Sequence, residues 1–518
     1  MSARTFLSDL LRIIEHMFGQ MSPAPPRSDV TARFDELFKR RYPSTTPESA
    51  ALLDRICSSS RAENRAAGER LAAIGELDLL RLRECGERES WATDTWDAIS
   101  AEVAAALEIS QALASSYLNY SRAMRIRLPE VGAGLIAGDI SYSTFQTIAY
   151  RTDLITDPEV MAAVDAELSL KVRRWPAMTR GRLVAAVDQI VARADRHAVR
   201  RRREQHADRE FSIWDGDNGL TEVFGRLVTT DAHAVDARLN ALAATVCEDD
   251  PRTLKQRRAD AIGALAAGAA KLQCRCGQPM CPAGATPVPC PVVIHVVANQ
   301  STLDGTKPDP GSIIGTDALI PAELIAQLAE SARLRPLVHP GDALPERGYV
   351  PSQALADFVR CRDLTCRFPG CDRPATEADL DHTIPHSEGG ATHASNLKSL
   401  CRQHHLIKTF WGWRDQQLPD GTVIWSSPSG HTYVTTPGSA LLFPTLCTPT
   451  GEVAPPRQPN HRTDRAAMMP RRRRTRAENR ATYVAAERRH NRGALEACRP
   501  AQPLTSPGPA PPGDPPPF

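Results

Sequence analysis

Apolar residues recur with helical periodicity through much of the N-terminal half of the chain. Residues 48–272 are rich in Ala and repeat apolar positions every three to four residues, as in ENRAAGERLAAIGELDLLRLRE, which predicts a largely helical domain. Within it, a break at 108–110 separates two apolar helices in the segment 103–124. This break fits an antiparallel helical hairpin, which is the commoner structure, or a helix-turn-helix that enters a DNA groove.

Shorter apolar runs bounded by turn residues predict strands further along the chain. The segment FSIWDGDNGLTEVFGRLV predicts two strands joined at the turn DGDNG, with a helix after them. PVVIHVVA predicts another strand, and PAELIAQLAESARL predicts a helix in the same connector. In WGWRDQQLPDGTVIWSSPSGHTYVTT the turn PDG predicts a further strand pair. We expect its tryptophans to pack in a small core rather than to stack on bases; they are Trp411, Trp413 and Trp425.

These elements predict a mainly α protein with a smaller α+β part. After about Pro437 the chain is first basic and then Pro-rich, and it lacks the apolar content that a core needs. The predicted order is a partly disordered lead-in (1–47), the helical domain (48–272), a connector with a cysteine cluster and a strand (273–350), a compact module dense in His, Cys, Trp and Gly (351–436), and a disordered tail (437–518).

The overall charge excludes two classes of protein. The chain carries 63 Lys and Arg against 61 Asp and Glu, a formal net charge of +2, which argues against a uniformly basic nucleic-acid coat and against an acidic disordered chain. The charge is uneven, since 12 Arg and 4 acidic residues give the segment 461–499 a net charge of +8 and leave 2 − 8 = −6 for the rest. We therefore expect the tail to supply much of any attraction to phosphate.

The sequence also predicts the compartment. No stretch approaches the roughly 18 to 20 uninterrupted apolar residues of a membrane helix. The apolar N-terminal stretch is interrupted by Asp9, Arg12 and Glu15, unlike a secretory signal. We therefore expect a cytoplasmic protein without a membrane partner. In the reducing cytoplasm, clustered cysteines indicate metal ligands before disulfides.

Two close-spaced pairs of ligands indicate a structural zinc site in the compact module. Cys366 and Cys371 are separated by four residues, Cys401 and His404 by two, and 29 residues lie between the pairs. Four soft or borderline ligands that close one loop are typical of tetrahedral Zn²⁺. Cys361 lies five residues before Cys366, and we interpret it as a thiol at a helix end rather than as a competing zinc ligand.

A second cysteine cluster lies between the helical domain and the PVVIHVVA strand. Cys274, Cys276, Cys281 and Cys290 fall within 17 residues, so they could bind a second structural zinc ion. Their spacing is irregular, and a redox-sensitive loop in which only some of the thiols are engaged fits as well.

The loop closed by the predicted zinc ion contains a second set of polar residues. Asp381 and His382 end an alternating run that predicts a strand, whereas Asn396 and His405 belong to the predicted helix NLKSLCRQHHLIKT. A carboxylate and an imidazole, Asp381 and His405, can hold one divalent cation at an open site. Beside them, His382 could accept a proton from water near neutral pH.

The order of these motifs resembles the HNH (His-Asn-His, ββα-metal) endonucleases. The motifs are DH, N, CRQHH and KT, the glycines at 389 and 390, and the flanking zinc pairs, over about 60 residues. The whole chain also looks like the actinobacterial 13E12-repeat family, in which an Ala-rich helical domain precedes a C-terminal HNH module. That wider likeness rests on the layout and on FPGCDRPAT, DLDHTIP, RAENRA and AAERR.

The resemblance implies a function and a role for each of these residues. It implies a DNA endonuclease that hydrolyses phosphodiester bonds and leaves a 5′-phosphate, with His382 as general base and Asn396 orienting the loop that bears it. Asp381 and His405 would bind one catalytic divalent ion, for which Mg²⁺, Mn²⁺, Ni²⁺ and Zn²⁺ are the candidates. The structural Zn²⁺ would be a separate ion. Three residues are candidates for contact with the DNA backbone, although solvated helix charges explain them as well: Lys398, Arg402 and Lys408.

Two features depart from the commoner HNH pattern, and one rival function stays open. The first pair of zinc ligands is Cys-x4-Cys. The fourth ligand of the zinc site is His404, and its spacing from Cys401 indicates that it binds zinc rather than the catalytic metal. His386 and His393 lie in a loop rich in Gly, Ser and Thr, where we expect them to be exposed. The rival is a catalytically inactive, zinc-stapled DNA-binding protein of mobile-element origin; the complete catalytic set favours the enzyme.

Overall fold

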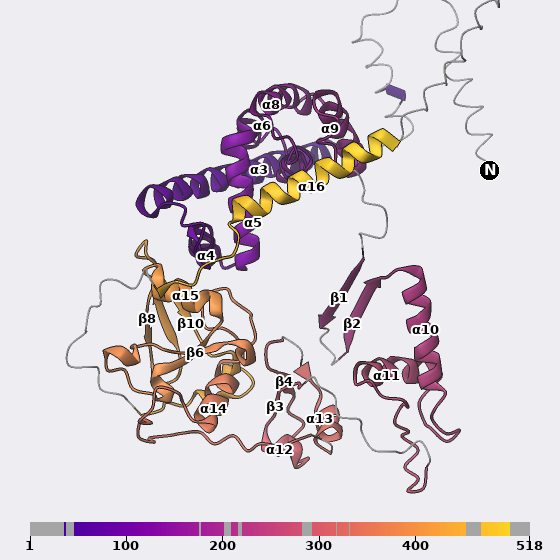
Figure 1. Ribbon diagram of the computed structural model, residues 1–518, viewed down its shortest axis with the longest axis vertical. Coiled ribbons are helices and arrows are strands. Elements are labelled where there is room, and N and C mark those ends of the chain that lie inside the picture. The colour runs from indigo at the N-terminus through magenta and orange to yellow at the C-terminus, as the bar shows by residue number, and fades with distance from the viewer. Residues whose placement is uncertain are drawn as a thin grey trace, which may run out of the picture.

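The computed structural model describes most of the chain as helices with small antiparallel sheets (Figure 1). The described residues are 36–37, 46–175, 178–200, 209–215, 220–281, 293–316, 319–330, 332–451 and 468–497. Most of the predicted lead-in therefore lies outside them. None of the helices within these ranges combines the length and the apolar character needed to cross a membrane.

The predicted helical character of the N-terminal part is confirmed by seven helices, a long one and six shorter ones. Helix α3 (Pro47–Cys85) begins at Thr46, whose side chain accepts a hydrogen bond from the backbone N–H of Ser49, and Pro47 occupies its first turn, where it costs no hydrogen bond. The others are α4 (Thr95–Leu107), α5 (Gln111–Arg122) with a short π-helical turn after it, α6 (Pro129–Ile136), α7 (Tyr142–Arg151), α8 (Pro158–Val172) and α9 (Arg180–Ala194).

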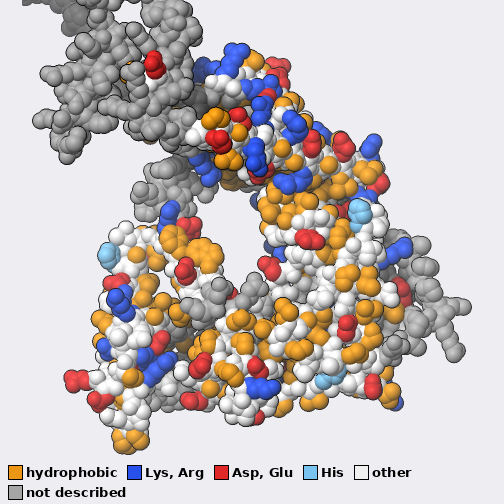
Figure 2. Space-filling view, turned by 180° about the vertical axis from the view of Figure 1, so that it is seen from behind, with side chains coloured by type: hydrophobic (Ala, Val, Ile, Leu, Met, Phe, Trp, Pro, Cys, Tyr) orange, Lys and Arg blue, Asp and Glu red, His pale blue; other side chains and the backbone are white. Residues whose placement is uncertain are grey.

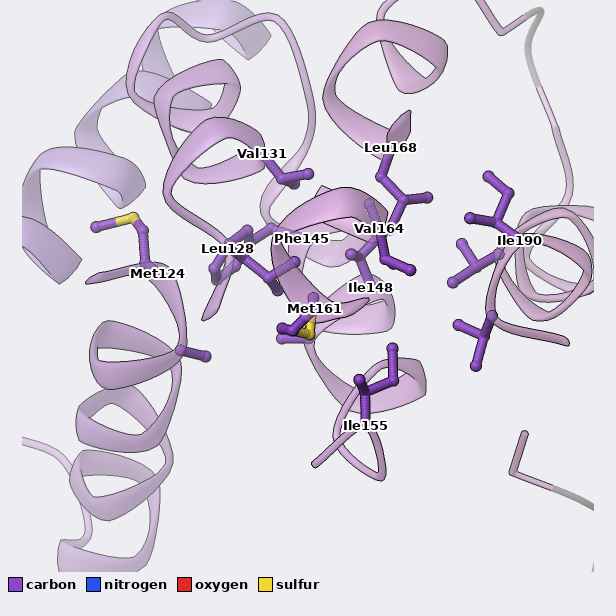
Figure 3. Close-up of a cluster of buried hydrophobic side chains, with 14 of the residues drawn as sticks. Met124, Leu128, Val131, Phe145, Ile148, Ile155, Met161, Val164, Leu168 and Ile190 are labelled. Atoms are coloured by element: carbon purple, nitrogen blue, oxygen red, sulfur yellow. The ribbon is translucent and has the colours of Figure 1, made fainter. Parts of the chain in front are cut away.

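The core of this domain lies where α6, α7 and α8 meet (Figure 3). Leu128, Phe145, Ile148 and Leu168 are fully buried there, and Ile190 of α9 closes one side. Apolar positions spaced three to four residues apart on each helix supply these contacts, as the periodicity of the sequence predicts.

The middle of the chain forms two smaller units. Strands β1 (Glu210–Asp215) and β2 (Thr221–Arg226) pair as the predicted hairpin and lead into α10 (Thr229–Ala243) and α11 (Leu254–Ala266). A three-stranded sheet follows in the order β3-β4-β5, and the strand predicted at 291–298 is reduced to β3. Its elements are β3 (Val296–Val297), α12 (Gln300–Leu303), β4 (Gly311–Ile313), β5 (Leu319–Ile320) and α13 (Ala322–Ala329).

The C-terminal module contains a ββα unit beside a second sheet. Strands β6 (Asp379–His382) and β7 (Leu397–Leu400) pair antiparallel, and α15 (Arg402–Phe410) follows β7 after one residue. The predicted helix over 396–409 is therefore wrong in its first half, because the fully buried residues 397–400 extend along β6 instead. Around this unit lie α14 (Gln353–Asp363), β8 (Arg414–Gln417), β9 (Val423–Ser426) and β10 (Thr432–Thr435).

The helical domain and the module share one hydrophobic core. Ala98, Ala101 and Ala105 of α4 belong to the same buried cluster as Phe368, Trp411, Trp413 and Trp425 of the module. The indole N–H of Trp411 donates to the carbonyl of Thr93 at 3.1 Å. The expected packing role of the three tryptophans is confirmed, since each is less than a tenth exposed.

The segment at 103–124 folds as a helical hairpin, and its second helix starts against the C-terminal module. Glu108 adopts a left-handed conformation that ends α4, and the Ser110 side chain caps α5. The first residue of α5 is Gln111, and its Oε1 atom forms a hydrogen bond with Nε2 of His404 in the module at 2.5 Å. Because a recognition helix contacts bases with its N-terminal residues, this helix end is already occupied.

The basic tail is ordered in part, which corrects the prediction of disorder for 437–518. Residues Arg476–Ala497 form helix α16, which returns along the helical domain (Figure 1). Arg472 and Arg476 form ion pairs with the buried carboxylates of Asp94 and Asp97 at 2.5 to 2.9 Å. Val484 belongs to the core of the helical domain. Apolar residues are sparse in this helix, and ion pairs to carboxylates far away in sequence hold it in place.

Candidate nuclease site and family

The four predicted zinc ligands lie together. All ligand atoms of Cys366, Cys371, Cys401 and His404 are within 4.8 Å of one another. The Nδ1 atom of His404 lies 3.4 Å from the Sγ atom of Cys401 and 3.6 Å from that of Cys366. Three thiols and one imidazole arranged in this way fit a closed tetrahedral zinc site.

The helical domain fixes which nitrogen of His404 faces this cluster. The Oε1 atom of Gln111 accepts a hydrogen bond from Nε2 of His404 at 2.5 Å, so Nδ1 carries the lone pair that a metal ion needs. The ring of Phe368 stacks on the imidazole with centroids 4.1 Å apart. A residue of α5 therefore orients a metal ligand of the module.

The predicted catalytic metal ligands also come together, and their geometry fits one cation. Asp381 Oδ1 and His405 Nε2 are 3.4 Å apart, a separation that two ligands of one ion with bonds of about 2.1 Å can adopt. On the other side of the ring, His405 Nδ1 is 2.8 Å from Asp379 Oδ2. This carboxylate orients the imidazole so that Nε2 faces Asp381.

The structure corrects the role predicted for two lysines. Lys398 is completely buried, and its ammonium group contacts Asp381 at 2.6 Å and Asp415 at 2.5 Å. Lys408 contacts the same two carboxylates at 2.6 and 3.2 Å. Neither side chain points to solvent, because both neutralise buried carboxylates. Of the three predicted phosphate contacts, Arg402 alone has an exposed side chain, and it lies 3.3 Å from Asp379.

These lysines determine the charge of the proposed metal ligand. Burial alone would raise the pKa of Asp381, but the positive charges of Lys398 and Lys408 beside it lower the pKa to about 2. Both lysines contact Oδ2, and Oδ1 faces His405. The carboxylate is therefore ionised near neutral pH and presents one oxygen to a cation.

The proposed base, His382, is held at the end of β6 by a short hydrogen-bond chain. Its Nε2 atom lies 2.9 Å from the hydroxyl of Thr392, and that hydroxyl donates to the carbonyl of Gly348 at 2.6 Å. Since the hydroxyl proton is used, Thr392 accepts from Nε2–H, and Nδ1 carries the lone pair. Burial lowers the pKa of His382 to about 4, so the ring is neutral near pH 7. Tyr349 stacks on it with centroids 5.3 Å apart.

Asn396 lies where the resemblance implies. Its Oδ1 atom accepts from the backbone N–H of Ile384 at 2.8 Å, and its Nδ2 atom donates to the carbonyls of Ile384 and Ala391. These bonds tie the two ends of the loop between β6 and β7 together. The side chain is buried and holds the turn directly after His382.

Several residues of the site escaped the sequence-based prediction. Asp379 had a signal, because it alternates with Asp381 on one face of a predicted strand. The sequence contains no such signal for Thr392 and Asp415, because the residues that they contact are far away in sequence or lie in another sheet. The expected exposure of His393 is wrong: it is 4% exposed and bonds Ser395 and the carbonyl of Ala343.

The second cysteine cluster forms with a different fourth member. Cys274, Cys276 and Cys281 gather around Cys247, and their ligand atoms are within 4.8 Å of one another. Cys290, which the sequence suggested, lies outside the described residues.

Comparisons with known proteins agree with this architecture. The family model for the domain of unknown function DUF222 matches residues 58–363, and that for HNH endonuclease matches residues 361–410. Two relatives from Mycobacterium tuberculosis (strain ATCC 25618 / H37Rv) are 45% identical to the chain. The uncharacterized protein Rv3776 aligns over 86% of this chain and 90% of its own length, and the uncharacterized protein Rv2100 over 86% and 88%. No solved structure matches the chain.

The two matched regions adjoin and together span the described structure from α3 to α15. The HNH match covers the zinc ligands, β6, β7 and α15, and it suggests a nuclease or nucleic-acid-binding function that uses a divalent metal ion. The chain therefore belongs to the DUF222 family and carries an HNH endonuclease domain directly after the DUF222 region.

Proposed function

We propose that this protein is a metal-dependent endonuclease that hydrolyses phosphodiester bonds of DNA. One observation carries the proposal: the carboxylate–imidazole pair of Asp381 and His405, with facing atoms 3.4 Å apart, is adjacent in β6 to His382, a neutral imidazole whose tautomer is fixed. A hard cation site beside an oriented base is what hydrolysis by an activated water molecule needs.

His382 acts as the general base. With Nε2–H held by Thr392, its Nδ1 lone pair takes a proton from the attacking water, and the low pKa keeps that lone pair available near neutral pH. Asn396 keeps the following turn in place, so the ring does not swing away from the phosphate. Asp381 and His405 would hold the divalent ion, which would supply stabilisation of negative charge on the phosphate and on the leaving 3′ oxygen.

The lysines and Asp379 prepare the metal ligands. Lys398 and Lys408 hold Asp381 ionised and in one orientation, and Asp379 aims His405 at the same point. The exposed Arg402 guanidinium, at the start of α15, lies close enough to this point to contact a backbone phosphate. The expected product has a 5′-phosphate and a 3′-hydroxyl.

Nicking of supercoiled plasmid by the full-length protein tests this function. We expect relaxed circles with Mg²⁺ or Mn²⁺, no nicking after EDTA, and resealing of the product by DNA ligase, which requires a 5′-phosphate next to a 3′-hydroxyl. Plasmid binding without nicking at any divalent ion would instead support the rival, a catalytically inactive DNA-binding protein. Nicks that ligase cannot reseal would contradict cleavage of the bond between phosphorus and the 3′ oxygen.

A further inference from the structure

Four cysteines outside the nuclease site converge at the end of α10. Cys247 follows that helix, and Cys274, Cys276 and Cys281 lie on the chain after α11. The four Sγ atoms are within 4.8 Å of one another, and those of Cys247 and Cys274 are 3.4 Å apart. None of the four forms a disulfide. Four thiols at mutual distances of this size surround a space of the size that one tetrahedral metal ion occupies.

The backbone around the thiols is held by bonds that do not involve sulfur. The backbone N–H of Leu272 donates to the Thr245 hydroxyl at 2.8 Å, and the backbone N–H of Arg275 donates to Asp250 at 3.0 Å. Arg252 joins the same segments, since it contacts Asp250 at 2.7 Å and the carbonyl of Gln273 at 2.7 Å. The two segments that carry the cysteines are therefore also joined by hydrogen bonds and ion pairs that position the thiols, as expected of a built site.

The described part of the unit that contains these cysteines has a small hydrophobic core. Its hydrophobic cluster consists of Leu239, Leu242 and Ala261, with Ala264 beside them. The β1–β2 hairpin that precedes it adds little, because its large apolar side chains are between 44% and 62% exposed; they are Phe211, Ile213, Trp214, Val223 and Phe224. Units of about 50 residues with such small cores commonly depend on a metal ion or a disulfide.

We propose that Cys247, Cys274, Cys276 and Cys281 bind a second, structural zinc ion. Thiolates are soft ligands that select zinc over Mg²⁺ or Ca²⁺, and four of them leave no open position for a substrate or for water. The ion crosslinks the end of α10 to the chain after α11 and so stabilises the DUF222 region far from the nuclease centre. This zinc is independent of whether the HNH site cleaves DNA.

Zinc content of the purified full-length protein tests the site. After dialysis, mass spectrometry of the metal should find two zinc ions per chain in the wild type and one in Cys247→Ser. Two matched controls, Cys290→Ser and Cys57→Ser, should keep two. Unchanged zinc in Cys247→Ser, or the loss of one ion in Cys290→Ser, would overturn the ligand assignment.

Alkylation of the native wild-type protein gives a second test that does not depend on how a variant folds. With maleimide under native conditions, Cys57, which is exposed, should react at once. Cys247, Cys274, Cys276 and Cys281 should react only after a strong chelator removes zinc. Rapid labelling of Cys247 before chelation would contradict the proposal, and so would a Cys247–Cys274 disulfide found by peptide mapping without reductant.

Discussion

Thr392 determines how the proposed general base is presented. Its hydroxyl accepts a hydrogen bond from Nε2–H of His382 and donates one to the carbonyl oxygen of Gly348, so one side chain sets both the ring orientation and the tautomer. The residue is 1% exposed and has no role in the core that a valine of the same shape would not fill. Replacement by valine therefore removes the hydrogen bond and leaves the packing unchanged.

We expect Thr392→Val to lower the rate constant of DNA nicking by about 10- to 100-fold, the usual effect of removing a residue that orients a ligand or a base. Binding of plasmid should stay unchanged, because Thr392 does not face solvent. Thr392→Ser keeps the hydroxyl and should recover most of the rate. Equal rates for the Val and Ser variants would show that this bond does not orient His382.

Lys398 is the residue for which sequence and structure differ most. A charged residue in a predicted helix is normally solvated, yet here β7 places it under Asp381 and Asp415. We expect Lys398→Met to lower the free energy of unfolding by about 3 to 5 kcal/mol, because two buried carboxylates each lose one of their two lysine partners. The matched variant Arg402→Met, whose side chain is exposed, should change it by less than about 0.5 kcal/mol. Urea unfolding of both variants measures the difference; similar losses would contradict the burial of Lys398.

At the scale of elements, helix α4 and the zinc loop depend on each other. Gly370, next to Cys371, has a φ of +72°, and a Cβ atom there would lie 2.6 Å from the carbonyl oxygen of Ile109. That carbonyl belongs to the turn between α4 and α5. The close approach of the two backbones requires glycine both for its conformation and for its size.

Comparison of two glycines separates these effects. Gly430 has a similar φ of +82° but open space around its Cβ position, so Gly430→Ala should cost about 1 to 2 kcal/mol from backbone strain alone. Gly370→Ala should cost clearly more and should also lower zinc affinity, because the turn beside Cys371 must move. Unfolding in urea and zinc competition with a chromogenic chelator measure both. Equal costs at the two positions would mean that α4 and the zinc loop are not in contact in solution.

The sequence predicted elements where the signal was local. The strand end at Asp381-His382, the helix break at 108–110 and the four zinc ligands follow from spacing and from residue type, and the structure places all of them as expected. The strand β7 was missed because its residues Leu-Lys-Ser-Leu do not alternate between apolar and polar, although all four are buried. Two leucines spaced three apart fit the period of a helix as well. Cys247 was missed because it is 27 residues away from Cys274.

At the scale of the whole molecule, the C-terminal segment returns to the helical domain. Asp94 and Asp97, which begin α4, receive Arg472 and Arg476, and Asp97 also accepts from Gln403 of α15. Residues from the helical domain, the module and the tail thus meet at one place. Figure 2, seen from behind relative to Figure 1, shows basic and acidic side chains mixed over the helical part of that face. Part of the local charge of +8 in the sequence is neutralised within the molecule, because four of its arginines pair with carboxylates of the helical domain; they are Arg472, Arg476, Arg480 and Arg488.

This pairing predicts that the tail stabilises the fold. The double variant Arg472→Ala/Arg476→Ala should lower the free energy of unfolding by roughly 1 to 3 kcal/mol, because buried carboxylates lose their hydrogen bonds. The control Arg473→Ala/Arg474→Ala removes the same charge from exposed positions of the same segment and should have little effect. If only the control variant weakened the fold, the ion pairs would be assigned to the wrong arginines.

In the proposed reaction, His382 removes a proton from water at the HNH site. The nicking rate of the variant His382→Ala tests this role. Wild type, His382→Ala and the exposed-histidine control His431→Ala are compared on supercoiled plasmid with Mg²⁺ or Mn²⁺ at equal zinc content. We expect loss of about 10²- to 10⁴-fold in rate for His382→Ala alone, the usual contribution of a general base. Nicking by His382→Ala at the wild-type rate would contradict the claim.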